Sequence, residues 1–339
     1  MQKNRQKLQR RKQMLFLICV GLILAAAAVG LIWKYNSQKI PTDFYINADA
    51  DAEGRAEGTL SYNGKEYRYN EHLSNYLFLG IDTEEKIETY EDKRDAGQAD
   101  AIFLVSYDRA KASVQCMVIP RDTITEISIF AADGSSLGTI EHHINLQYAY
   151  GDAKEKSCDL MVNAVSGLLY DMPIQGYCAM NMDGIPNLAE VVGGVEVIVP
   201  NDSMEDAYPE FAKGAEVTIT AENAEQFVRY RNTAKSQSAV TRTERQKAFI
   251  GAFVEKTQQL YAQDAAIVSE LYEGVRDYMI TNMGNDLFVK LLEAAKGSKA
   301  ETKVQTLPGK ADNDGTFDVY YVDDDALFEM ILDMFYVEG

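Results

Sequence analysis

The sequence predicts an α/β protein, namely a three-layer α/β/α sandwich with a central mixed β-sheet, preceded by one N-terminal transmembrane helix. Apolar runs with the length of buried strands alternate with segments whose apolar residues recur at the 3.6-residue period of a helix. One uncharged stretch, residues 14–33, is long enough to cross a membrane. With 339 residues, the chain can also bury a large core.

The N-terminal residues predict a membrane anchor. Residues 1–13 contain six Lys and Arg and no acid, and the 20 residues that follow carry no charge. At ~1.5 Å per residue, such a helix spans the ~30 Å hydrocarbon core. A cleaved signal peptide has an apolar region of only about 7–15 residues; residues 25–29 could imitate a cleavage site, so cleavage remains the alternative. Since basic flanks stay inside, we expect a cytoplasmic tail (1–13), a transmembrane helix (14–33) and an extracytoplasmic remainder.

The charge balance limits which partners the external part can attract. The chain has 33 Lys and Arg against 52 Asp and Glu. Without the six basic residues of the tail, 27 remain against 52, a net charge near −25. Such a surface repels nucleic acid and anionic polymers at long range. A basic cluster within it would therefore be a specific anion site.

Four cysteines argue against a disulfide scaffold. Cys19 lies in the predicted membrane helix, and the other three cannot all pair within one chain. We expect buried free thiols instead.

Residues 34–73 are predicted to hold the main domain away from the membrane. Residues 36–57 are polar, rich in alanine and acid, and lack periodicity, as in a stalk. Residues 59–69 predict a small hairpin, because Asn63-Gly64 is a strong two-residue turn signal. The main domain is expected to cover residues 74–339.

Three buried strands are expected at the start of the main domain, each with a charged residue beside one end. The apolar runs cover residues 77–81, 101–105 and 114–119. Asp82 follows the first run, Asp100 precedes the second and Arg121 follows the third. Open α/β sheets bind ligands where strands end and loops begin. The alternative is that Asp82 and Asp100 are turn or cap residues.

The later elements alternate between helices and strands, after a predicted loop at residues 131–138. Apolar residues at helical spacing, the Gly193-Gly194 stop and a capping box at residues 241–244 mark the helices. The expected helices cover residues 158–170, 183–193, 220–231, 242–262, 267–280, 286–295 and 326–336. Runs rich in β-branched residues mark the strands. These strands are expected at residues 174–182, 195–199, 303–307 and 319–322.

Four arginines occupy positions from which they can converge on one anion. Arg121 ends a strand, Arg229 and Arg231 lie two residues apart at a helix end, and Arg242 lies in the predicted first turn of the next helix. Gln246 shares the helix face of Arg242, four residues later. A helix N-terminus beside an arginine attracts anions, and guanidinium groups bind phosphate bidentately. Several of them suit a diphosphate; the alternative for each is a surface salt bridge in an acidic protein.

Asp82 and Asp100 beside a phosphate require a cation between them. Mg²⁺ binds through one or two carboxylates plus phosphate oxygens. Together with the arginines, the two aspartates predict a magnesium–pyrophosphate site.

Motifs over residues 74–335 resemble those of the LytR-CpsA-Psr family of cell-envelope proteins. The matching segments are YLFLGIDT (76–83), ADAIFLVSYD (99–108), VIPRDT (118–123), HHINLQYAYG (142–151), MNMDGIPNLAEVVGGVEVIVP (180–200), AEQFVRYRNT (224–233) and RTERQKAF (242–249). LPG at 307–309 and the closing YVDDDALFEMI also look like the family's C-terminal end. Seven motifs in this order are a specific signal.

The resemblance implies a transferase on the outer face of the membrane. It would move a glycopolymer, such as teichoic acid or capsule, from an undecaprenyl-pyrophosphate carrier to peptidoglycan. Asp82 and Asp100 match the family's Mg²⁺-binding aspartates. The other matches are pyrophosphate-binding residues, with the arginines also stabilising the leaving phosphate: Arg121, Arg229, Arg231, Arg242 and Gln246.

Two departures from the family pattern leave parts of the mechanism open. Gln98 stands where the family has an arginine, for which Arg94 or Lys93 can substitute. Ala239 stands where the family has an aspartate, so the general base is not assigned, and Asp82 and Asp122 remain possible proton acceptors. Two alternatives follow: a non-catalytic binder of polyprenyl-linked glycans, and a polyprenyl-pyrophosphate phosphatase. The polymer itself is not identified.

Overall fold

The computed structural model describes residues 59–83, 97–131, 133–230, 238–297, 304–313 and 318–339. The predicted tail, transmembrane helix and stalk lie outside these ranges. Within the described ranges, no helix is both long and apolar enough to cross a membrane.

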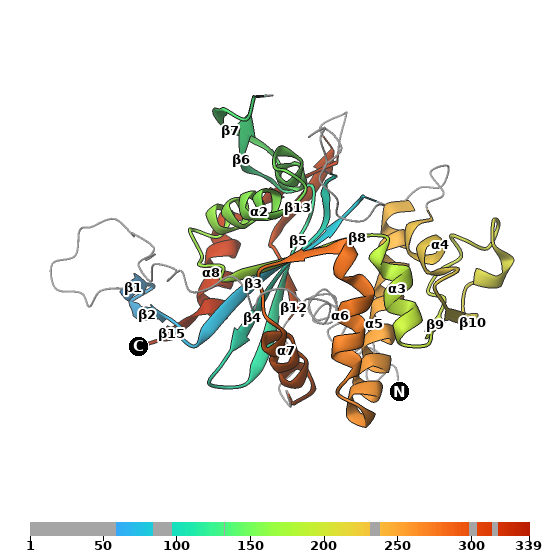
Figure 1. The fold of residues 1–339 in the computed structure, drawn as a ribbon. Coiled ribbons are helices and arrows are strands. Elements are labelled where there is room, and N and C mark those ends of the chain that lie inside the picture. The colour runs from blue at the N-terminus through green and yellow to red at the C-terminus, as the bar shows by residue number, and fades with distance from the viewer. Residues whose placement is uncertain (1–58, 84–96, 132, 231–237, 298–303, 314–317) are drawn as a thin grey trace, which may run out of the picture.

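A six-stranded mixed sheet forms the centre of the molecule (Figure 1). Its strands, in spatial order, are β11 (Met279–Thr281), β8 (Gly176–Asn181), β3 (Leu73–Ile81), β4 (Ala99–Asp108), β5 (Ser113–Ile119) and β12 (Val304–Thr306). The β3–β8 and β5–β12 pairs are parallel, and the other pairs are antiparallel. The prediction of an α/β fold with a central mixed sheet is confirmed.

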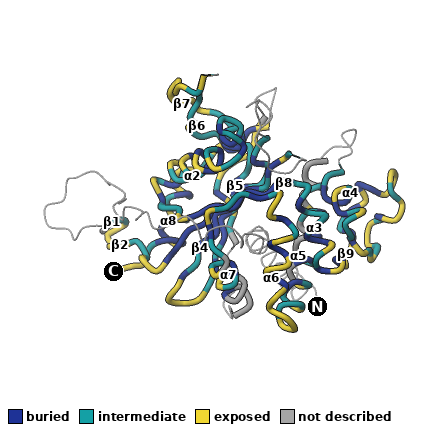
Figure 2. Tube along the Cα trace, in the orientation of Figure 1, coloured by how far each residue is buried: buried dark blue, intermediate teal, exposed yellow. Residues whose placement is uncertain are grey.

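Helices pack on both faces of this sheet because its central strands are apolar on both sides. Phe78 pairs with Phe103 across β3 and β4, and both belong to the core cluster on one face. The neighbouring pair, Leu77 and Leu104, belongs to the cluster on the other face. This alternation is the two-residue period of a strand, and Figure 2 shows β4 and β5 largely buried.

The helices divide between these two core clusters. The first cluster contains residues of α3 (Gly184–Val191), α4 (Ala224–Arg229), α5 (Ser238–Gln263), α6 (Ile267–Val275) and α7 (Asn285–Gly297). The second contains residues of α2 (Glu155–Leu168) and α8 (Asp324–Phe335). Short 3-10 helices are η2 (Ile144–Tyr150), η3 (Pro209–Phe211) and η4 (Arg276–Tyr278).

Four small sheets surround this centre. They are β1 (Thr59–Tyr62), β2 (Lys65–Tyr69) and β15 (Tyr336–Glu338); β6 (Ile124–Phe130) and β7 (Ser136–His143); β9 (Val195–Ile198) and β10 (Glu216–Ile219); and β13 (Gly309–Asn313) and β14 (Asp318–Val322). The predicted hairpin at residues 59–69 is present, and both residues of its turn, Asn63 and Gly64, have positive φ. β15 extends this hairpin sheet, so the C-terminus packs against it.

Parts of two predicted elements have a different secondary structure from the one expected. The loop expected at residues 131–138 agrees with the structure at its described residues up to 135, where the chain turns between β6 and β7, but residues 136–138 begin β7, which is largely exposed and so lacks an apolar signal. The helix expected over 267–280 ends at Val275, because residues 279–281 pair with β8 as an edge strand. The expected buried thiols are confirmed for the described cysteines, since Cys116, Cys158 and Cys178 are buried and form no disulfide.

The strand directions bring the predicted site residues to one edge of the sheet. β3, β5 and β8 end there, and the antiparallel β4 begins there. Asp82 follows β3, Asp100 is the second residue of β4, and Arg121 lies two residues beyond β5.

We expect Leu104→Ala to lower the free energy of unfolding by about 2–5 kcal/mol, because Leu104 is fully buried in the central sheet. Leu137→Ala is the matched control, since the Leu137 side chain is 63% exposed, and it should change stability by less than about 0.5 kcal/mol. Denaturant unfolding of both variants measures the difference. Equal losses would contradict the assigned core.

Candidate functional site

Asp100 is the point at which two of the predicted arginines meet. Arg121 Nη1, from the turn after β5, donates to Asp100 Oδ1. Arg242 Nη2, from α5, lies 3.9 Å from Asp100 Oδ2. One carboxylate therefore holds guanidinium groups from two elements that are far apart in the sequence, as the convergence hypothesis requires.

Asp82 lies beside this pair and is held by the start of the next strand. Its Oδ1 accepts the backbone N–H of Gln98 at 2.6 Å, and its own N–H donates to Gln98 O at 3.1 Å. Gly97 allows this approach, because it has φ +77° and a Cβ there would lie 2.4 Å from Thr83 Cγ2 and 3.0 Å from Asp82 Oδ1.

The Asp82 carboxylate has an environment that favours a nearby cation. Although the residue as a whole is exposed, partial desolvation raises the pKa of Asp82 most strongly, the Gln98 hydrogen bond lowers it, and the charge of Asp100 raises it. The net direction is upward. Two carboxylates that repel each other in this way are stabilised when a cation binds between them.

These two carboxylates fit the requirements of Mg²⁺, which takes one or two protein carboxylates and completes its shell with phosphate oxygens and water. Among the described residues, no group of three or more His, Cys, Asp or Glu could hold a metal, so a complete protein cage is absent there.

The side chain of Asn145 is a second feature that fits a hydrated ion. Asn145 is 4% exposed, and its Oδ1 has no hydrogen-bond partner among the described residues, which suits a water donor.

Asn145 was not predicted as a site residue, and it explains the role of Gln98. Its Nδ2 donates to Gln98 Oε1 at 3.0 Å, and its backbone N–H donates to Arg121 O at 3.3 Å. Asn145 thus connects the Asp82 loop to the Arg121 turn. Its place in the HHINLQYAYG motif was the available signal, but only the fold brings η2 to this edge.

The turn that carries Arg121 is fixed by several hydrogen bonds. Thr123 donates through Oγ1 and N to Pro120 O, at 2.6 and 3.1 Å. Tyr320 of β14 donates its N–H to Asp122 O at 2.8 Å. Arg121 Nε also lies 3.3 Å from Asp122 Oδ1. The guanidinium is therefore held between Asp100 and Asp122.

The predicted helix start at residue 242 is wrong, because α5 begins at Ser238 and places Arg242 in its second turn. The residues read as a capping box have other partners. Asn201 Nδ2 donates to Thr241 O at 2.9 Å and to Glu244 Oε2 at 3.0 Å. Arg242 therefore approaches Asp100 from the second turn of α5, and not from the first turn as predicted.

The remaining predicted residues fall on α4, on α5 and outside the described ranges. Arg229 ends α4 and donates to Glu225 Oε1 at 2.6 Å. Gln246 Nε2 donates to Val228 O at 3.2 Å, which ties α5 to α4. Arg231 and Arg94 lie outside the described residues, and so does the side chain of Ala239.

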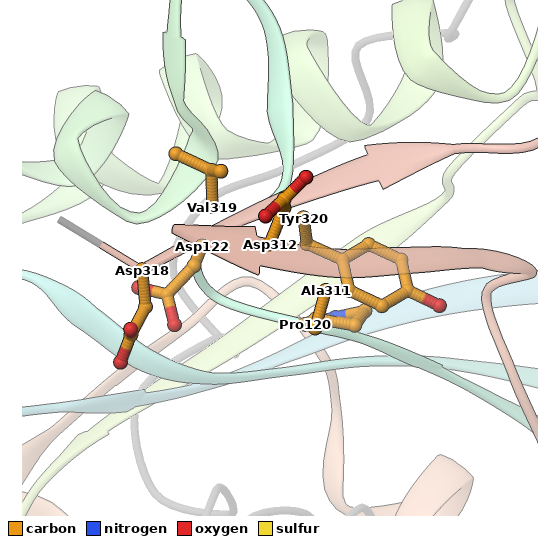
Figure 3. Close-up of a pocket in the computed structure, with 7 residues that line it drawn as sticks. All are labelled: Pro120, Asp122, Ala311, Asp312, Asp318, Val319 and Tyr320. Atoms are coloured by element: carbon orange, nitrogen blue, oxygen red, sulfur yellow. The ribbon is translucent and has the colours of Figure 1, made fainter. Parts of the chain in front are cut away.

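A cavity of about 460 Å³ adjoins the Arg121 turn (Figure 3). It is lined by Pro120, Asp122, Ala311, Asp312, Asp318, Val319 and Tyr320. Figure 3 shows the Asp122 and Asp318 side chains together at one end. Burial raises the pKa of Asp122, the nearby Arg121 and His143 lower it, and Asp318 raises it; the net direction is upward. A lining with three carboxylates and no basic residue favours a neutral or cationic occupant over an anion.

The fold and this site define a class: α/β proteins with a central mixed sheet that carry arginines and carboxylates at one sheet edge. The LytR_cpsA_psr family model matches residues 42–334, so the chain belongs to this family. Among solved structures, the crystal structure of TagV from Bacillus subtilis superposes with a TM-score of 0.56 at 22% identity, covering 77% of this chain and 94% of TagV. This likeness shows the shared fold.

Curated relatives cover most of the chain at low identity. The polyisoprenyl-teichoic acid–peptidoglycan teichoic acid transferase TagU of Halalkalibacterium halodurans is 26% identical over 77% of this chain and 79% of its own length. The corresponding transferase TagT of Bacillus subtilis is 26% identical over 85% of this chain and 81% of its own.

We expect Gln98→Ala to destabilise the protein by about 1–3 kcal/mol, because it leaves the buried Asn145 amide without its side-chain acceptor. Gln263→Ala, at an exposed position of α5, is the control and should change stability by less than about 0.5 kcal/mol. Thermal unfolding of the two variants measures the difference. A Gln98→Ala variant as stable as the control would remove the structural role assigned to Gln98.

Proposed function

We propose that the protein transfers an anionic glycopolymer, such as teichoic acid or capsule, from an undecaprenyl-pyrophosphate carrier to peptidoglycan by Mg²⁺-dependent phosphoryl transfer. Family membership and the activity of the TagU and TagT relatives support this proposal. The observation that carries it is the meeting of Arg121 and Arg242 on Asp100, beside Asp82. Cations and carboxylates gathered in this way suit a metal-bound pyrophosphate.

The arginines would bind the pyrophosphate and stabilise the leaving group. Arg121 and Arg242 can exchange their Asp100 contacts for phosphate oxygens, which they bind bidentately. Arg229 on α4 and Arg231, just beyond it, complete the predicted set, with Gln246 and Arg94 as further contacts. Phosphoryl transfer depends mainly on positioning and on neutralising charge as it develops. Fixed guanidinium groups supply both.

Asp82 and Asp100 would hold Mg²⁺. When bound there, the ion would neutralise phosphate charge and polarise the phosphorus–oxygen bonds. If Asp100 binds the metal, Arg121 and Arg242 can bind phosphate oxygens instead of Asp100.

Asp122 would accept the proton of the incoming hydroxyl. The sugar oxygen forms a bond to the phosphorus that carries the glycopolymer, and the bond from that phosphorus to the bridging oxygen breaks. Polyprenyl phosphate leaves, and the hydroxyl proton moves to a carboxylate. Asp122 is placed for this step because it lines the acidic cavity and contacts Arg121. Asp82 is the alternative acceptor, but the metal would compete for its oxygens.

The proposed reaction requires a location at the outer face of the membrane, where the carrier lipid and peptidoglycan meet. We place residues 1–13 in the cytoplasm, residues 14–33 across the membrane and the described domain outside. The basic tail, the uncharged 20-residue stretch and the acidic remainder support this single-pass type II arrangement.

Two other functions use the same site differently. A non-catalytic binder of polyprenyl-linked glycans would need the arginines but no proton acceptor, and the Gln98 and Ala239 departures favour it. A polyprenyl-pyrophosphate phosphatase would let water replace the sugar hydroxyl. The retained aspartates and arginines favour an enzyme over a binder.

The transferase test uses the full-length chain in detergent, a synthetic polyprenyl-pyrophosphate glycan and peptidoglycan fragments. We expect linked product to form with Mg²⁺ and to disappear when the ion is chelated. Arg121→Ala should slow transfer by about 10²–10³-fold, because it removes charge stabilisation of the leaving phosphate. Chromatography of released polyprenyl phosphate and linked product measures both steps.

Arg276→Ala is the control, because Arg276 forms an exposed ion pair with Glu273 on α6 and η4. It should transfer at the wild-type rate. Polyprenyl phosphate released without linked product would identify the phosphatase instead. Bound donor without turnover in the presence of Mg²⁺ would leave the glycan binder.

We expect Asp122→Asn to lower the transfer rate by about 10²–10⁴-fold, because an amide cannot accept the hydroxyl proton. Binding of the donor should persist, since Arg121 retains its contact with Asp100. Asp312→Asn changes another carboxylate of the same cavity and serves as the control. Single-turnover rates and donor affinity separate the two effects. A wild-type rate in Asp122→Asn would assign the proton to another group.

A further inference from the structure

One buried arginine of α5 belongs to none of the predicted roles. Arg245 is only 1% exposed and is the largest of the fully buried side chains in the described structure. It lies three residues after Arg242 and directly before Gln246. Burying a cation costs several kcal/mol unless its hydrogen bonds are satisfied. Its partners therefore indicate what it is for.

Two of the four hydrogen-bond acceptors of Arg245 lie at the C-terminal end of α4. Nε donates to Phe227 O at 2.9 Å, and Nη2 donates to Tyr230 O. Nη1 donates to Ser203 Oγ and lies 3.5 Å from Thr241 O. The fork of the guanidinium suits carbonyls that diverge in this way.

These bonds support the C-terminal end of a short helix. α4 has six residues, and the last carbonyls of any helix lack intrahelical donors. Arg245 and Gln246 together satisfy the carbonyls of Phe227, Val228 and Tyr230. Arg229 lies within this bonded segment, so its backbone is clamped to α5, the helix that carries Arg242.

The charge of Arg245 adds to the positive potential of this region. All four of its partners are uncharged oxygens. Burial, and after it the charge of the nearby Arg242, lower the pKa of Arg245 to about 10. The side chain is still cationic at neutral pH. An anion bound at Arg242 would therefore relieve the repulsion between the two arginines.

We infer that Arg245 is a positioning residue that clamps α4 to α5, so that Arg229 and Arg242 face one pyrophosphate group. This inference rests on the proposed function for the identity of the anion. The fork geometry is the essential feature, because a lysine at this position keeps the charge but cannot reach the diverging carbonyls together.

The test compares Arg245→Lys with wild type in the full-length chain, using inorganic pyrophosphate with Mg²⁺ as the probe. We expect calorimetry to show about 10- to 100-fold weaker binding in the variant at 20 °C, below its unfolding transition, because misplaced groups lose affinity steeply. Phe253→Leu is the matched control: Phe253 is fully buried on the same helix, and its truncation should lower stability while the hydrogen bonds from Arg245 to Phe227 O and Tyr230 O remain.

Each outcome decides the inference. Weaker binding in Arg245→Lys and normal binding in Phe253→Leu support it. Wild-type affinity in Arg245→Lys, or an equal loss in Phe253→Leu, overturns it. If Arg245→Lys does not fold, Ser203→Ala removes one acceptor of the same guanidinium, and affinity should fall by about threefold; an unchanged affinity overturns the inference.

The binding measurement also separates this inference from the proposed function. Wild type that binds pyrophosphate but forms no linked product contradicts the transferase and leaves the clamp to be judged by the variants. Wild type that binds no pyrophosphate overturns the clamp together with the anion site.

Discussion

The contact between Arg121 and Asp100 is the interaction on which the site depends. It joins the turn after β5 to the start of β4, and Arg242 brings α5 to the same carboxylate. Each guanidinium is thereby neutralised within the protein, which limits the cost of holding several cations together. Such contacts are exchangeable. On the proposed function, phosphate oxygens would replace Asp100 at the arginines, and Mg²⁺ would replace the arginines at Asp100.

The residues at this edge of the sheet could be predicted from the sequence because buried strands form easily recognised apolar runs. The runs beginning at Leu77, Ala101 and Val114 are almost wholly apolar. The charged residues next to these runs therefore lie at the strand ends. Strand order turned that pattern into geometry: an antiparallel β4 between two strands that end at this edge places Asp100 beside Asp82 and Arg121. Elements with weak apolar patterns were misassigned, including the exposed strand β7 and the three-residue strand β11.

Asn145 and Arg245 could not be predicted from the sequence because their roles depend on partners far along the chain. Asn145 bonds to Gln98, 47 residues earlier, and Arg245 bonds to Ser203, 42 residues earlier. A buried polar group is informative only when its partners are known, since an isolated Asn or Arg in a sequence is usually exposed. Gln98 shows the same limit. As a departure from the family pattern it suggested a lost function, whereas its side chain accepts a hydrogen bond from Asn145 of η2 and its backbone N–H donates to Asp82.

The overall charge has a consequence for how an anionic donor would reach this site. A domain with a net charge near −25 repels an anionic glycopolymer, and the arginine cluster attracts it only within about 8 Å at physiological ionic strength. Steering from solution would therefore be poor. On the proposed function, the donor is held in the membrane by its lipid and reaches an anchored enzyme by lateral diffusion, which requires no long-range attraction. On this proposal, the acidic cavity beside Arg121 would disfavour a second anionic group and admit a sugar hydroxyl. The acidic residues that repel free anionic polymer would thus also keep the anionic donor and the neutral acceptor hydroxyl on different sides of the reacting phosphorus.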